Sequence, residues 1–189
     1  MKPMNTPLHH IRILSSGLLA FTLCASAASA AGPSPMAQGL HQWPALEGKL
    51  MLVVGTYQDV TSYRRSYSFY FKPAREEAWN QVPVIRKKGE AAFPWESASG
   101  GEVTIADGIV VPRAGAVYFV VADKRIGRDS SYDDKGDITA TWNKLSEASD
   151  DETDGPAYRL QPVFARRYRN SALTVEAVLA REAKLKPAK

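Results

Sequence analysis

The stretch Tyr63-Arg-Arg-Ser-Tyr-Ser-Phe-Tyr-Phe71 decides the fold class, because its side chains alternate along the chain. Odd positions share one largely aromatic face and even positions share a more polar one: Tyr63, Arg65, Tyr67, Phe69 and Phe71 against Arg64, Ser66, Ser68 and Tyr70. A period of two is typical of a half-buried β-strand. The stretch therefore predicts a strand whose aromatic face packs on a core.

Further β-rich segments lie on both sides of this strand. We expect strands over residues 49–57, 79–85, 102–106, 109–111, 116–122, 138–145 and 158–169. Pro83 indicates a sheet edge or a bulge, and Asp107-Gly108 predicts a tight hairpin turn between two of the segments. Residues 86–90 are expected to form a turn, and residues 91–101 and 146–156 to form loops.

The C-terminal segment 173–185 has apolar residues at helical spacing and is the one segment that looks helical. Thr174 is the expected N-cap, with Leu173 and Val178 at the two positions of a hydrophobic staple. Seven or eight strands followed by one helix, without βαβ alternation, predict a mostly β protein. We expect an antiparallel β-sandwich with a short C-terminal helix.

Residues 1–30 have the pattern of a cleaved signal peptide, with Lys2 and Arg12 before an apolar run and an Ala28-Ser-Ala30 site. Leu23 before Cys24 argues against a lipid anchor at that cysteine. We expect an exported, periplasmic protein with no membrane span. Residues 31–189 are expected to form one domain, in which residues 31–45 are an irregular N-terminal arm.

The composition of the mature chain excludes several kinds of chemistry. Without residues 1–30 it has 159 residues, a formal net charge of +2, no cysteine and one histidine, His41. A cysteine nucleophile, a disulfide and a cysteine zinc site are thereby excluded, and the near-neutral charge gives no case for nucleic acid. Serine hydrolase, metallohydrolase and nucleotide-binding motifs are missing from the sequence. We expect no enzyme, no metal and no cofactor.

The segment from Arg125 to Asp137 carries the densest set of candidate binding groups. Arg125 and Arg128 are suited to bind carboxylates, and Ser130, Ser131 and Tyr132 offer adaptable hydrogen-bonding groups. The alternative is a polar connection between two strands. The segment from Arg125 to Asp137 matches the ligand pattern of a calcium-binding loop poorly.

A second candidate is an anion-binding or aromatic face around Tyr63, Arg64 and Arg65, where cationic and aromatic side chains are adjacent in the sequence. The aromatic residues of the strands are candidates for a ligand cleft. Packing in the core or in a dimer face is the alternative for these residues.

The order of the segments resembles the family of carbapenem intrinsic-resistance proteins, CarG and its relatives. The matching residues are Ser66-Tyr-Ser-Phe-Tyr-Phe71, Trp79-Asn-Gln-Val-Pro-Val84, Ser99-Gly-Gly101 with Asp107, Val121-Ala-Asp-Lys-Arg-Ile-Gly127 with Asp133, Gly155-Pro-Ala-Tyr158 and Val175-Glu-Ala-Val178. The chain departs from the family pattern where relatives often carry two cysteines, near Val103 and Leu173.

The resemblance implies a β-sandwich, a homodimer, and protection against carbapenem β-lactams by binding rather than hydrolysis. The fold it implies is also similar to that of periplasmic inhibitors of invertebrate-type lysozyme. The alternative function is therefore a lysozyme-inhibitor-like protein that blocks an enzyme cleft with a loop. The expected partner is a β-lactam ligand or an envelope protein such as a lysozyme. A hydrolase that uses two carboxylates is a third alternative.

Overall fold

The computed structural model describes residues 36–58, 63–86, 89–100, 103–127, 131, 134–149, 151–152 and 154–185. Twelve strands and one helix follow one another in this part of the chain: β1 (Gly39–Ala45), β2 (Gly48–Gln58), β3 (Tyr63–Pro73), β4 (Asn80–Val82), β5 (Val84–Ile85), β6 (Ala91–Ala92), β7 (Trp95–Glu96), β8 (Ala98–Gly100), β9 (Val103–Arg113), β10 (Ala116–Arg125), β11 (Gly136–Glu147), β12 (Tyr158–Ser171) and α1 (Val175–Glu182). Expectations about residues 1–35 lie outside the described residues.

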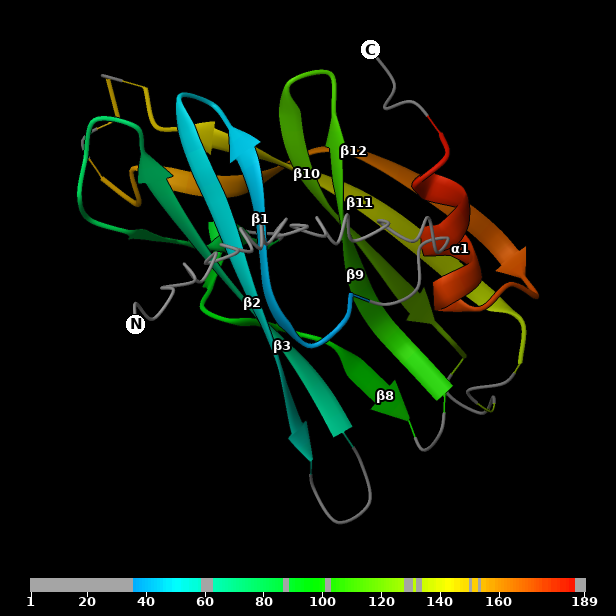
Figure 1. The fold of residues 1–189 in the computed structure, drawn as a ribbon. Coiled ribbons are helices and arrows are strands. Elements are labelled where there is room, and N and C mark those ends of the chain that lie inside the picture. Colours follow the sequence, from blue (N-terminus) through cyan, green and yellow to red (C-terminus); the bar gives the residue numbers. More distant parts are fainter. Residues whose placement is uncertain are drawn as a thin grey trace, which may run out of the picture. The chain divides into compact units, whose positions relative to one another are not determined.

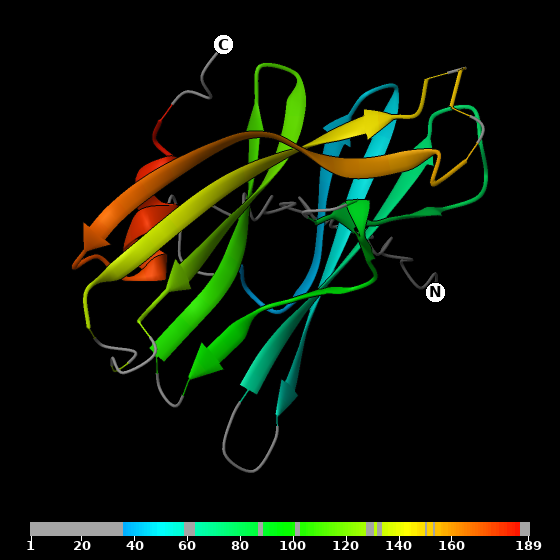
Figure 2. The same cartoon turned by 180° about the vertical axis from the view of Figure 1, so that it is seen from behind.

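The strands form two sheets, and α1 packs on the larger one (Figures 1 and 2). Sheet A has the order β1-β2-β3-β4, with β7 also paired to β3, and sheet B has the order β6-β5-β12-β11-β10-β9-β8. All pairs are antiparallel except β5 with β12. The predicted mostly β sandwich with a short C-terminal helix is confirmed.

The alternation in Tyr63–Phe71 is confirmed in the core between the sheets. Tyr67, Phe69 and Phe71 are fully buried there, and their rings meet Phe119 of β10 and Tyr158 of β12. Aromatic pairs with centroids about 5 Å apart add packing energy to the burial of apolar area. This core joins sheet A to one face of sheet B.

A second core lies between sheet B and α1. Ile138, Ala140 and Trp142 of β11 share one face, and they pack against Val178 and Leu179 of the helix. Further along the same strand, the buried residue Leu145 belongs to the core between the sheets. Sheet B therefore has sheet A on one face and α1 on the other.

The Asp107-Gly108 pair does not form the predicted hairpin turn, because β9 runs straight through both residues. A Cβ at Gly108 would lie 2.4 Å from the ring of Phe119, so the glycine allows this ring to pack on the backbone. The β9–β10 turn lies instead at Ala114 and Gly115, whose positive φ angles of 50° and 77° suit a tight hairpin.

Other strand boundaries also differ from expectation. Residues 39–45 are not an irregular arm but edge strand β1, where Pro44 is tolerated because an edge strand has a neighbour on one side only. Pro83 marks the point where the chain leaves sheet A for sheet B, and its carbonyl accepts a hydrogen bond from the Leu160 amide at 2.9 Å. The expected loop 91–101 contains the short strands β6, β7 and β8.

The predicted N-cap of the helix is confirmed. Thr174 has an extended backbone, and its hydroxyl accepts a hydrogen bond from the Ala177 amide at 3.2 Å. Leu173 and Val178 belong to the same apolar cluster, as the hydrophobic staple requires. The local sequence therefore determines where α1 begins.

We expect Thr174→Ala to lower the free energy of unfolding by about 1 kcal/mol, because the first turn loses the acceptor for one of its free amides. Urea denaturation followed by circular dichroism measures the change. Thr174→Ser, which keeps the hydroxyl, is the control and is expected to stay close to the parent. Equal losses in both variants would contradict the capping role.

Candidate functional site

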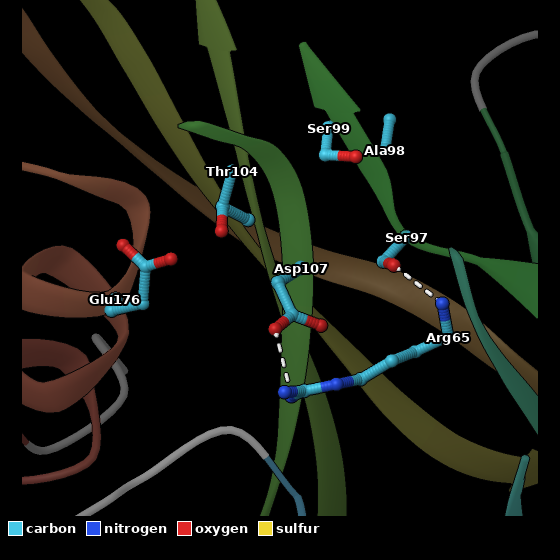
Figure 3. Close-up of a pocket in the computed structure, with 7 residues that line it drawn as sticks. All are labelled: Arg65, Ser97, Ala98, Ser99, Thr104, Asp107 and Glu176. Carbon is cyan, nitrogen blue, oxygen red and sulfur yellow. Dashed lines mark hydrogen bonds and ion pairs between the residues drawn. The ribbon is translucent and has the colours of Figure 1, made fainter. Parts of the chain in front are cut away.

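A polar cluster lies where sheet A, sheet B and α1 come together (Figure 3). Arg65 comes from β3, Asp107 and Thr104 from β9, Ser97 from the residue between β7 and β8, and Glu176 from α1. The alternation of β3 places Arg65 on the same face as the aromatic core, which brings its guanidinium to the end of that core. The cluster thus connects all three layers.

Asp107 is the centre of this cluster, and its side chain is only 5% exposed. Its Oδ1 accepts hydrogen bonds from the Tyr67 hydroxyl and, at 2.8 Å, from the Gly108 amide. Its Oδ2 accepts one from Nη1 of Arg65 at 3.3 Å. A buried carboxylate with three donors, one of them cationic, has the partners that burial of a charge demands.

The pKa values of the two carboxylates in the cluster, Asp107 and Glu176, are shifted in opposite directions. Burial raises the pKa of Asp107 above its ordinary value, and the donors Tyr67 and Gly108 together with the charge of Arg65 reduce this rise. Burial also acts to raise the pKa of Glu176, but hydrogen bonds, of which the one from Thr104 is the largest, outweigh it and lower the pKa. Burial, followed by the charge of Asp107, raises the pKa of the Tyr67 hydroxyl, which therefore remains a donor.

The cavity beside Asp107 has a volume of ≈ 50 Å³. It has room for a few water molecules, but pockets for small-molecule ligands have volumes of roughly 300 Å³ or more. We therefore assign the cluster a structural role, in which Asp107 ties β3 to β9.

A surface hollow of ≈ 350 Å³ lies where β10 ends and β11 begins. Its lining includes residues from the ends of β10 and β11 and from β12, among them Arg125, Lys135, Asp137, Thr139, Arg167 and Asn170. Three of these side chains are cationic and one is anionic. This hollow contains Arg125, which the sequence selected as a carboxylate binder.

The other predicted loop residues are placed only in part. Ser131 is exposed, and its amide donates a hydrogen bond to Oδ2 of Asp134 at 2.7 Å. Arg128, Ser130 and Tyr132 lie outside the described residues, so the predicted binding loop remains a prediction.

The structure does not bring Arg64 and Arg65 together, because successive residues of a strand point to opposite faces. The exposed Arg64 lies 3.8 Å from Glu96, whereas Arg65 reaches the buried Asp107. The expected anion site therefore does not form from these two guanidinium groups. Tyr63 belongs to β3, but its side chain is outside the described part.

Of the other aromatic residues, Tyr67, Phe69, Phe71, Trp95 and Trp142 are buried in the cores, whereas Trp79 is 39% exposed.

A second buried carboxylate, Glu182 of α1, was not among the candidate residues selected from the sequence, and it is 0% exposed. It accepts hydrogen bonds from Nε1 of Trp142 at 2.7 Å and from the Tyr168 hydroxyl at 2.5 Å, and Nε of Arg166 lies 3.1 Å away. Burial, then the hydrogen bond to Glu182, raises the pKa of Tyr168 to about 12. The signal was present in the sequence, because residue 182 continues the buried 175, 178, 179 spacing.

Among the described residues, no group of three or more histidine, cysteine, aspartate or glutamate side chains is arranged to hold a metal ion. No helix in the same part of the chain is long and apolar enough to cross a membrane.

These observations define a two-sheet β-sandwich in which one sheet also carries a C-terminal helix, with polar groups that join its layers. A crystal structure of CarG has this fold: the TM-score is 0.62, and the match covers 82% of this chain and 96% of the CarG chain at 17% sequence identity. The chain therefore has a CarG-like fold, as the resemblance of its segments predicted. No protein-family model and no curated protein matches the sequence.

Proposed function

We propose that the protein is an exported, CarG-like envelope protein that protects against carbapenem β-lactams by binding rather than by hydrolysis. The observation that carries the proposal is the match to CarG over 82% of the chain. The signal-peptide pattern of residues 1–30 supports export to the periplasm.

The sizes of the two cavities support binding at the surface. The ≈ 50 Å³ cavity beside Asp107 is too small to enclose a β-lactam, whereas the ≈ 350 Å³ hollow is within the range of ligand sites. The hollow presents Arg125, Lys135 and Arg167, and a carbapenem carries a carboxylate that guanidinium groups bind well.

Deletion of the gene is expected to lower survival in a carbapenem, and the full-length gene is expected to restore it. A gene that encodes residues 31–189 without the leader is the matched control, and it should fail to restore survival because its product stays in the cytoplasm. Purified protein should leave the ring absorbance of the carbapenem unchanged. Unchanged survival of the deletion strain would reject the proposal, and measured turnover of the ring would reject its non-enzymatic part.

A second candidate function is inhibition of an envelope lysozyme by the β10–β11 connection. The exposure of Ser131 at this connection favours it. Purified protein would then slow lysis by an invertebrate-type lysozyme, and Tyr132→Ala would weaken the effect. Full lysozyme activity at saturating protein would exclude this function.

A further inference from the structure

The hollow lies on the face of sheet B that does not pack against α1. Arg125 pairs with Asp137, and Thr139 pairs with Arg167, in the register of β10, β11 and β12. Ile138 and Ala140, which alternate with Asp137 and Thr139, are buried under α1. The hollow therefore lies on the face opposite α1, and Arg125 and Arg167 are exposed there.

The positive charge of the hollow is only partly balanced. Asp137 supplies one negative charge, and its Oδ1 accepts a hydrogen bond from the backbone N–H of Asn170 at 2.9 Å. Arg125 lies 4.0 Å from Asp123, and both side chains are more than half exposed, so this pair is weak. Lys135 and Arg167 form no ion pair with any residue that the structure describes.

Gly136 brings two of the cations together. A Cβ at this position would lie 2.5 Å from the carbonyl oxygen of Arg125, so no other residue fits here without a shift of the backbone. The close approach keeps Arg125, at the end of β10, beside Lys135, which immediately precedes β11. The backbone thus holds together the strand ends that carry Arg125 and Lys135, and Arg167 of β12 also lines the hollow.

We propose that this hollow binds a small oxyanion, a carboxylate or a phosphate. Arg125 and Arg167 supply planar guanidinium groups that can each donate two hydrogen bonds to such a group. Lys135 adds a third positive charge, and the Thr139 hydroxyl is a neutral donor at the same surface. The inference concerns the chemistry of the anion and does not depend on the proposed function.

Titration of the mature protein with inorganic phosphate, acetate and a carbapenem, each followed by two-dimensional ¹H–¹⁵N NMR, tests the proposal. All three anions should shift the amide signals of Gly136, Thr139 and Arg167, and raised sodium chloride should weaken the binding. The carbapenem esterified at its carboxylate should bind more weakly than the free acid. These arms separate a β-lactam carboxylate from other sources of the same chemistry.

Arg125→Gln and Arg167→Gln are each expected to raise the dissociation constant about fivefold, and the double variant more than tenfold. Arg75→Gln, an exposed arginine in the turn after β3, is the matched control and should bind like the parent. Spectra of the free variants show whether each remains folded.

The absence of shifts at these residues in millimolar phosphate and acetate would overturn the oxyanion site, and so would equal binding by the parent and the double variant. An ester that binds as tightly as the free acid would also overturn it. Anion binding at the hollow combined with normal carbapenem survival of the deletion strain would retain the site and reject the proposed function.

Discussion

Replacing Glu182 with alanine is expected to lower the free energy of unfolding by about 3–5 kcal/mol, because it removes the carboxylate from a buried cluster. The indole N–H of Trp142, which is 0% exposed, and the Tyr168 hydroxyl lose their acceptor. The guanidinium of Arg166 loses its counter-charge. The gain in helix propensity from alanine is at most a few tenths of a kcal/mol, so it cannot compensate.

Urea denaturation measures this loss, and hydrogen exchange of the α1 amides locates it. Glu182→Gln keeps the size and one acceptor, and its loss should be smaller than that of alanine. Glu47→Ala, in the exposed turn between β1 and β2, is the matched control and should change stability by about 0.5 kcal/mol or less. A loss below about 1 kcal/mol for Glu182→Ala would mean that the cluster does not anchor the helix.

Replacing Asp107 with alanine is the second large change, with an expected loss of about 2–4 kcal/mol. Tyr67 is 0% exposed, so its hydroxyl cannot exchange the lost acceptor for bulk water. Arg65 is 22% exposed and regains part of its hydration, which limits the loss. Asp151→Ala, in an exposed turn, is the control. Stability within about 0.5 kcal/mol of the parent would show that Asp107 does not join the sheets.

The pH dependence of stability gives an independent check on Asp107. Because its pKa in the folded protein is raised above 3.8, the folded state holds the proton more tightly than the unfolded state does. The free energy of unfolding of the parent, relative to Asp107→Asn, should therefore fall as pH rises from 3.8 through the pKa of the folded protein. A relative stability that is flat or rises over this range would contradict the assignment.

Local sequence patterns predicted those elements whose pattern repeats along the chain. The alternation in Tyr63–Phe71 placed the core face of β3, and the apolar spacing with Thr174 and Leu173 placed the start of α1. The prediction of a turn at Asp107-Gly108 was wrong, because this dipeptide occurs both in hairpin turns and within strands where a side chain packs on the glycine. The ring of Phe119, eleven residues further on, decides between them, and a local pattern does not contain that contact.

The candidate sites were predicted less well, because each is assembled from different layers. Arg125 was selected from the sequence and lies in the cationic hollow. Arg167 was not selected, because it joins the hollow only through the pairing of β12 with β11. Arg65 was selected as part of an anion site with Arg64, and its partner is instead Asp107 of the other sheet. The helical spacing places Glu182 on the buried face of α1. Its hydrogen-bond donor Trp142 comes from another element, so the spacing alone does not show that the buried carboxylate has a partner.

The sequence by itself determined the β-sandwich class, the aromatic core face of β3 and the beginning of α1, because alternation and capping act between near neighbours. Tertiary structure decided which charged side chains are buried with hydrogen-bond partners and which remain exposed to solvent. The physical reason is that a charge gains or loses its hydration according to what packs over it. Sheet A packs on one face of sheet B and α1 on the other, so Asp107 and Glu182 are enclosed with partners, whereas Arg125 and Arg167 remain exposed.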